Sequence, residues 1–305
     1  MNYNELSQTI QDYTETAEQL FVLNIPVFVK QAEERIYNSV QIPSLRRNVT
    51  GTLTTSNSYL SCPDDYLSTY SLAVVKADGS YEYLLNKDVN FIRAAYPSPT
   101  DVGIPRYYAL FGSQFYSSNE LSFILGPTPD ADYQAELHYF YYPPTIVQGT
   151  IATFGTLVPG TSYSAGTYLG VSLTGGQGTG AIADIVVSGG GVSSVTIRNP
   201  GALYVVGNVL SATAASIGNT GAGFTIQVDT VENSAGTSWL GDNYSPVLLY
   251  GAMREAILFQ KGEQDLVAYY EQKFQEALAQ LNRLGTGLER GDAYRDGQAK
   301  IKVNP

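Results

Sequence analysis

The side chains that most often carry chemistry are scarce in this 305-residue chain. Its one histidine, His138, lies in an alternating run of tyrosines, where a structural role is expected. Its one cysteine, Cys62, is followed by Asp64 and Asp65, and nearby carboxylates raise the pKa of a thiol and oppose its reactivity. A structural zinc site takes four ligands that are mainly Cys and His, so no metal site is predicted. A single cysteine also leaves no internal disulfide.

Paired carboxylates could act as acid and base in glycoside hydrolysis. Asp64-Asp65 and Glu33-Glu34 are adjacent pairs, but neighbours on a helix or strand diverge, so both are interpreted as solvated surface. Carboxylates from distant parts of the chain could still meet in the fold, so a cell-wall hydrolase is one alternative. Turnover assays on variants of Asp64 and Glu136 would test it. The segment Gly178–Ala183 matches a dinucleotide-binding fingerprint, but a strand and no helix is predicted after it, so the match is rejected. No catalytic residue and no cofactor are predicted.

The net charge of the chain indicates whether it could bind nucleic acid. The chain has 17 Lys and Arg against 28 Asp and Glu, a formal net charge of −11. That argues against binding nucleic acid through a broad basic surface, whereas an acidic surface would let DNA pass without sticking. No apolar run reaches the ~18–20 residues of a membrane span, and the polar N-terminus predicts no signal peptide.

Low charge and abundant tyrosine indicate an assembly subunit. Charged residues are 15% of the chain, where soluble domains average about 25%, and there are 24 tyrosines. Tyrosine offers a large contact area and a polar handle, which suits surface hidden against neighbouring copies. The competing interpretation is that tyrosine is simply favoured in strands.

Helical periodicity marks both ends of the sequence. After a short first helix, a second is predicted to begin near Asn24, with Pro26 in its first turn. Near the other end, a helix after Ser245-Pro246 precedes a longer one that stops at Gly285. Isolated helices are marginal, so their apolar stripes are expected to pack on one another. The residues expected in this packing are Phe28, Ala32, Ile36, Leu266, Tyr270, Phe274 and Leu281.

Strand patterns fill the middle of the chain. Alternating runs from 45 to 147 predict an antiparallel β domain with a hairpin turn at Asp78-Gly79. Residues 148–237 are dominated by Gly, Ser, Thr, Val and Ile, and regular β-branched runs among the glycines favour a small sandwich or barrel-like module over a flexible linker. The predicted fold class is α+β. Its parts are a helical bundle (1–44 plus 238–285), a β domain (45–147), an inserted glycine-rich all-β module (148–237) and an extended C-terminal tail (286–305).

Several segments, in their order and spacing, resemble the head-to-tail adaptor (head-completion, tail-tubular-A-like) proteins of short-tailed bacteriophages. The segments are Ile25–Ile36, Cys62–Leu67, Pro105–Leu110, Phe123–Pro129 and Thr237–Asn243. The resemblance spans two blocks, from about residue 4 to 144 and from 237 to 285. Between them, Thr174–Ala181 and Asn199–Gly201 resemble β modules inserted in phage virion proteins.

The resemblance implies a non-enzymatic structural protein of the virion neck or tail, assembled in the cytoplasm of the bacterial host. It implies a homo-oligomeric ring, expected to be twelvefold, which joins the portal protein to tail nozzle or fibre proteins. Double-stranded DNA would pass through the ring without specific binding, and no membrane is involved. The residues expected to dock on the portal or on a neighbouring copy are Arg290, Tyr294, Arg295, Lys300 and Lys302.

A protein that binds glycans or mediates adhesion is the alternative to a structural adaptor. It would act through aromatic side chains of the glycine-rich module, on which sugar rings could stack. The aromatic residues available there are Phe154, Tyr163, Tyr168, Tyr204 and Phe224.

Overall fold

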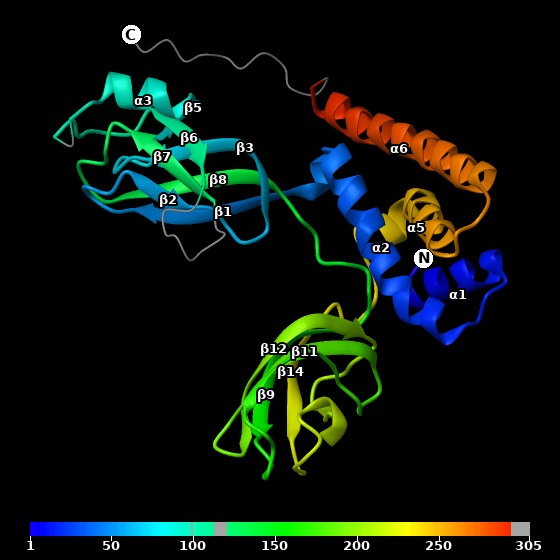
Figure 1. The fold of residues 1–305 in the computed structure, drawn as a ribbon. Helices are drawn as coiled ribbons and strands as arrows, with labels where there is room; N and C mark the ends of the chain where they lie inside the picture. Colours follow the sequence, from blue (N-terminus) through cyan, green and yellow to red (C-terminus); the bar gives the residue numbers. More distant parts are fainter. Residues whose placement is uncertain (99, 113–120, 294–305) are drawn as a thin grey trace, which may run out of the picture. The chain divides into compact units, whose positions relative to one another are not determined.

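The computed structural model describes residues 1–98, 100–112 and 121–293, with 286–293 as backbone only. The fold is α+β, as predicted, with helices at both ends of the chain and mainly antiparallel sheets between them (Figure 1). It divides into two compact units, one formed by residues 1–40 with the chain from 144 onward, the other by residues 41–143. Because the helices and the glycine-rich strands fall in the same unit, the separate module 148–237 stays a prediction.

The first unit contains the helices of both chain ends, and we call these helices the helical unit. They are α1 (Tyr3–Thr14), α2 (Gln19–Ser39), α4 (Trp239–Asn243), α5 (Ser245–Phe259) and α6 (Gln264–Ala293). Helix α1 begins with a capping box: Asn2 Oδ1 accepts from the Glu5 N–H at 2.9 Å, and Glu5 Oε2 accepts from the Asn2 N–H at 3.0 Å. These bonds satisfy backbone donors that a helix start otherwise leaves unpaired.

Helix α2 starts earlier than the sequence predicts. It begins at Gln19, so Pro26 lies inside the helix and the predicted start near Asn24 is wrong. Asn24 does not cap; its Nδ2 donates to the carbonyl oxygen of Leu20 at 2.7 Å from within the helix. Pro26 removes the N–H that would bond the carbonyl of Val22, and the buried residues on either side of it hold the helix together.

Helix α6 ends later than the sequence predicts. It continues through Gly285 to Ala293, so the predicted stop at Gly285 is wrong and residues 286–293 are helical instead of extended. A glycine ends a helix only where the backbone turns left-handed; otherwise it costs about 1 kcal/mol relative to alanine. Leucine, glutamate and arginine at 288–290 are good helix formers, which favours continuation.

Helix α5 packs against both α2 and α6. Gly251 permits the close approach, because a Cβ there would lie 2.9 Å from the Ala32 Cβ and 3.1 Å from the Phe274 ring. Of the residues expected in helix packing, Phe28, Ala32, Ile36, Phe274 and Leu281 are buried. Tyr270 is half-buried, and Leu266 is 45% exposed, so the expectation that Leu266 lies in this core is wrong. Leu266 stands in the first turn of α6, where the helix has only just left its connecting turn.

The second unit is built from two four-stranded sheets with a shared core. One sheet has the order β1 (Arg46–Leu53), β8 (Tyr133–Tyr141), β3 (Tyr66–Val75), β4 (Tyr81–Tyr83); the other has the order β2 (Tyr59–Ser61), β7 (Ser122–Gly126), β6 (Tyr107–Phe111), β5 (Leu85–Asn86). Helix α3 (Val89–Ala95) packs on β6 and β7. The core includes Leu72, Phe123 and Leu137, contributed by strands of both sheets.

The hairpin predicted at Asp78-Gly79 is confirmed. Strands β3 and β4 pair antiparallel from Val75 opposite Tyr81, and the Lys76 N–H donates to the Ser80 carbonyl at 2.9 Å. Gly79 has φ +80°, a left-handed conformation that glycine adopts without a steric penalty. Asp78 Oδ1 accepts from the Ser80 N–H at 2.9 Å and closes the turn.

The glycine-rich segment folds into two three-stranded antiparallel sheets. One has the order β10 (Gly166–Ser172), β11 (Thr179–Ser188), β12 (Gly191–Ala202); the other has the order β13 (Val209–Leu210), β14 (Thr225–Glu232), β9 (Thr150–Val158). Both contribute to one core, in which Ile185, Phe224 and Val228 are almost fully buried. The fingerprint-like Gly178–Ala183 runs into strand β11, which agrees with the rejection of a dinucleotide site.

The first and last strands of this segment pair at their outer ends. Thr150 of β9 stands opposite Glu232 of β14, and the Gly149 N–H donates to the Asn233 carbonyl at 3.3 Å. The chain therefore enters and leaves the segment at one point.

Candidate interaction surfaces of the helical unit

The loop between α1 and α2 and the turn between α5 and α6 lie together at one end of the helices. Gln260 Nε2 donates to Thr16 Oγ1 at 2.7 Å. The Phe259 ring packs against those of Phe21 and Phe28, with centroids 6.2 and 5.2 Å apart. We call this region the acidic end and define it by its exposed carboxylates, Asp12, Glu15, Glu18, Glu263 and Asp265.

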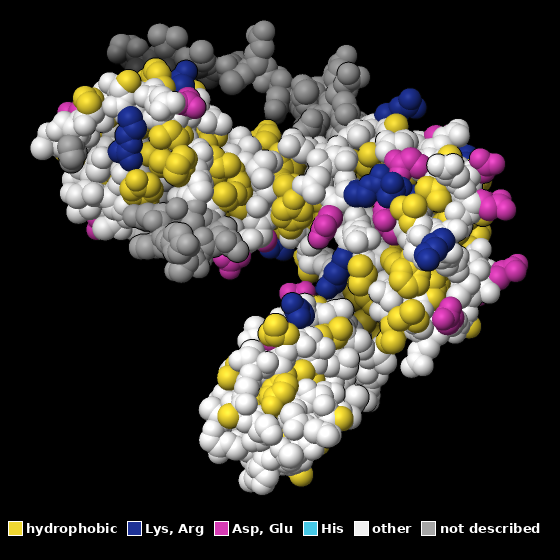
Figure 2. All heavy atoms as spheres, viewed as in Figure 1, with side chains coloured by type: hydrophobic (Ala, Val, Ile, Leu, Met, Phe, Trp, Pro, Cys, Tyr) yellow, Lys and Arg dark blue, Asp and Glu magenta, His cyan; other side chains and the backbone are white. Residues whose placement is uncertain are grey.

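The acidic end also exposes apolar side chains. Tyr13 is 62% exposed, Leu20 59% and Tyr269 52%. Large exposed apolar groups next to charges are typical of surfaces that bind another protein. Figure 2 shows acidic and hydrophobic side chains side by side over the helical part of the chain.

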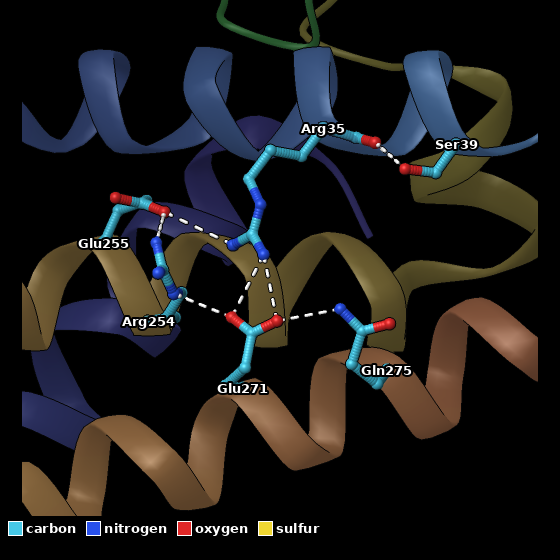
Figure 3. A network of polar contacts seen from close by, with 6 residues as sticks. All are labelled: Arg35, Ser39, Arg254, Glu255, Glu271 and Gln275. Atoms are coloured by element: carbon cyan, nitrogen blue, oxygen red, sulfur yellow. Dashed lines mark hydrogen bonds and ion pairs between the residues drawn. The ribbon is translucent and has the colours of Figure 1, made fainter.

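A network of ion pairs joins three helices (Figure 3). Arg35 of α2 donates through Nη2 to both carboxylate oxygens of Glu271 in α6, at 3.0 Å each, and lies 3.4 Å from Glu255 of α5 through Nη1. Arg254 contacts the same two carboxylates, at 2.6 Å to Glu255 and 2.8 Å to Glu271. The Arg35 guanidinium also stacks over the Phe274 ring at 4.6 Å. The network therefore fixes α2, α5 and α6 against one another.

The charges in this network act on Glu271. Burial alone would raise the pKa of its carboxyl group, but hydrogen bonds from Gln275 and Arg35 and the charge of Arg254 hold that pKa below its usual range. Glu271 is therefore ionised at neutral pH. A shallow depression of about 520 Å³ lies beside it, lined by Gln31, Glu34, Arg35, Asn38, Ser39, Glu255, Phe274 and Gln275.

Glu33 of α2 is a buried acid. Its side chain is 3% exposed, so the interpretation of Glu33-Glu34 as solvated surface is wrong for Glu33, while Glu34 is exposed. Burial raises the pKa of Glu33 to about 7, although hydrogen bonds from Thr145 and Ile146 oppose the rise. Its position could have been found from helical phase, because it lies four residues after Val29 and three before Ile36, which are both buried.

The predicted docking residues fall at and beyond the end of α6. Arg290 lies in the helix, where only the backbone is described. Tyr294, Arg295, Lys300 and Lys302 lie outside the described residues. The structure brings none of these five side chains to a surface that can be named.

His138, Cys62 and Asp65 lie in surroundings that fit a structural role. His138 Nδ1 lies 3.1 Å from Ser71 Oγ and its Nε2 lies 3.4 Å from Glu136, a cross-strand row on β3 and β8. Burial raises the pKa of Cys62 to about 12, which keeps the thiol protonated and unreactive. Asp65 accepts from Arg47 and from the Tyr139 hydroxyl, each at 2.7 Å. Within the described ranges no group of His, Cys, Asp and Glu is arranged to hold a metal ion.

The aromatic residues of the glycine-rich segment face its core. Tyr163, Tyr204 and Phe224 are 6%, 3% and 1% exposed, and the partly buried Phe154 and Tyr168 pack against the same core. An aromatic platform for sugar rings needs exposed ring faces. The residues on which the glycan-binding alternative depended therefore do not supply it.

Comparisons with known proteins identify the family. Residues 1–173 match the family model described as SU10 adaptor protein, which is more than half of the chain. The match covers α1, α2, the whole second unit and the first strands of the glycine-rich segment. No curated protein matches the chain. Among the described residues, no helix is long and apolar enough to cross a membrane. The chain belongs to the SU10 adaptor protein family and is a structural adaptor protein of a bacteriophage virion.

Proposed function

We propose that this protein forms a ring between the portal of the phage head and the tail, as a head-completion adaptor of the tail-tubular-A-like type. The observation that carries the proposal is the adaptor-family match over residues 1–173. By the resemblance described above, the ring is twelvefold and its partners are the portal protein and tail nozzle or fibre proteins. Assembly takes place in the cytoplasm of the bacterial host.

The surface of the helical unit supports association with other subunits. Tyr13, Leu20 and Tyr269 would remain exposed to water in a solitary chain. Burying apolar surface at about 25 cal/mol per Å² is the main driving force of protein association. An adaptor that is complete only in a ring accounts for large apolar groups at the end of a helical bundle.

The charge of the chain supports a DNA passage without DNA binding. A net charge of −11 repels the phosphate backbone, and nucleic-acid affinity arises mainly from phosphate neutralisation by Lys and Arg. A ring with acidic walls lets the duplex slide. The proposal therefore includes a DNA path along the ring axis and no specific DNA contact.

The end of helix α6 and the residues that follow it form the proposed docking segment. This region carries four cationic side chains and one tyrosine, which are Arg290, Tyr294, Arg295, Lys300 and Lys302. Deleting 294–305 leaves α6 whole and should abolish stable docking.

The decisive experiment is the mass of the purified chain alone and with rings of the portal protein from the same phage. We expect a species that joins the portal as a complete ring, measured by native mass spectrometry. Twelve copies per portal is the expected count. A chain that never binds portal rings, with or without residues 294–305, contradicts the proposal.

A further inference from the structure

We infer that residues 294–305 of one copy bind the acidic end of the next copy and so join neighbouring subunits head to tail. The inference rests on the proposed ring and names one of its contacts. The acidic end is the exposed set of Asp12, Glu15, Glu18, Glu263 and Asp265, held together by the contact between Gln260 and Thr16.

The acidic end and the segment 294–305 carry opposite charge. The first 29 residues contain four acidic side chains and no lysine or arginine, since Lys30 is the first cation of the chain. The turn between α5 and α6 adds Glu263 and Asp265 against the single cation Lys261. By contrast, residues 294–305 contain Arg295, Lys300 and Lys302 and one acid, Asp296. A cationic segment therefore meets a surface where acids outnumber cations.

The acidic end and the segment 294–305 also both contain apolar side chains. Residues 300–303 alternate cationic and apolar side chains in the order Lys-Ile-Lys-Val. The acidic end offers both kinds of contact, because its carboxylates lie among the exposed Tyr13, Leu20 and Tyr269. Tyr294 adds an aromatic group to the same segment.

The length of α6 favours contact with another copy. The helix starts at the acidic end and runs for 30 residues, about 45 Å at 1.5 Å per residue. The segment 294–305 spans at most about 40 Å when fully extended. Even when fully extended back along α6, the segment would therefore fall short of the start of that helix, whereas the next copy of a head-to-tail arrangement can present its acidic end directly. Head-to-tail contacts of this kind close into rings.

Cysteine cross-linking between two different variants tests the contact. One full-length variant carries Lys302→Cys and the other carries Glu15→Cys; Cys62 stays in place because it is buried. Asp242→Cys is the matched control, an exposed acid beside Gly241, whose carbonyl binds the Met1 amino group at the opposite end of α1 from Glu15.

We expect the mixture of Lys302→Cys and Glu15→Cys to give about tenfold more disulfide-linked dimer than the mixture with Asp242→Cys. Equal yields from the two mixtures, or no dimer from either, overturn the inference. If the Glu15 dimer is absent while the chain still binds portal rings, the tail contact is wrong and the proposed function stands. If that dimer forms but portal rings are not bound, the tail contact stands and the proposed function is wrong.

Charge reversal gives a second test on full-length chains. Lys300→Glu with Lys302→Glu, or Glu15→Lys with Glu18→Lys, should each weaken self-association about tenfold in sedimentation equilibrium. Mixing the two reversed variants should restore association, because the reversed segment then faces a reversed acidic end. A mixture that associates no better than either variant alone contradicts the inference.

Discussion

The carboxylate of Glu33 accepts a hydrogen bond of 2.8 Å from the backbone N–H of Ile146, far along the chain. The hydroxyl of Thr145 donates to the other carboxylate oxygen at 2.6 Å. Asn233 Nδ2 donates in turn to the Thr145 carbonyl at 2.7 Å. Glu33 of α2 therefore binds Thr145 and Ile146, which precede the glycine-rich strands. Thr145 is bound in turn by Asn233, which follows those strands.

Glu33 should make the stability of the helical unit depend on pH. The pKa of its carboxyl group is about 7 in the folded chain and 4.5 when unfolded, so the folded state retains a proton that the unfolded state releases. Its contribution to stability is complete below pH 4.5 and is lost as pH rises to 7. Glu33→Gln should flatten this dependence and raise the free energy of unfolding at pH 8 by on the order of 1–3 kcal/mol. Urea unfolding at pH 5 and pH 8 measures both effects.

Glu34→Gln provides the control for that prediction, since Glu34 is the exposed neighbour on the same helix. It should leave the pH dependence unchanged. A Glu33→Gln variant whose stability falls between pH 5 and 8 as steeply as that of the unchanged chain would contradict the assignment.

Arg35 should be the most sensitive position of the ion-pair network. Arg35→Ala removes the partner that Glu255 and Glu271 share across three helices and should lower the free energy of unfolding by about 1–3 kcal/mol. Arg35→Lys keeps the charge but loses the two-pronged contact with Glu271, so its loss should be smaller but measurable. Arg283→Ala, an exposed change on α6, is the control and should cost less than about 0.5 kcal/mol. Equal effects at Arg35 and Arg283 would show that the network contributes nothing.

Gly251 should resist any larger side chain. Gly251→Ala places a methyl group 2.9 Å from the Ala32 Cβ and 3.1 Å from the Phe274 ring, which should cost about 1–3 kcal/mol through overpacking. Ala32→Gly makes room for that methyl group, so the double variant should lose less stability than the two single changes added together. Thermal unfolding of the four proteins gives this double-mutant cycle. Strict additivity would argue against the close approach of α5 and α2.

Removing the glycine-rich strands should leave the helices folded. Deleting 150–232 and joining 149 to 233 by a short glycine linker keeps the Tyr3 N–H bond to the Gly236 carbonyl and the Asn233 contacts. We expect helical circular dichroism and ring assembly on portal to be retained. Unfolding of the shortened chain would show that the helices need the strands, and the insertion model would then be wrong.

The sequence predicts the elements of this fold better than their ends. The turn at Asp78-Gly79 is found because it depends on local chemistry, a glycine with positive φ and an aspartate that closes the turn. The start of α2 is missed because Asn24 and Pro26 are local start signals, whereas burial of Phe21 and Ile25 extends the helix backward. Tertiary packing of this kind outweighs propensity and is not visible in a short window.

In the candidate surfaces too, local features could be predicted from the sequence and contacts between distant residues could not. Acidity at the start of the chain is read directly from Asp12, Glu15 and Glu18, but its union with the turn at Glu263 depends on packing of Phe259 on Phe21 and Phe28. Arg35 stands in the predicted helix, yet its partners Glu255 and Glu271 lie more than 200 residues away in sequence. No local sequence pattern predicts an ion pair between residues so far apart.

The pairing of Thr150 with Glu232 gives the chain a stem of two adjacent strands, whose ends lie about 5 Å apart. Any foreign domain whose own termini lie that close could be grafted onto this stem without stretching the helices beneath it. The predicted module 148–237 could be exchanged in this way while the helices stay the same, and an engineer could use the stem to display a chosen domain on a virus particle.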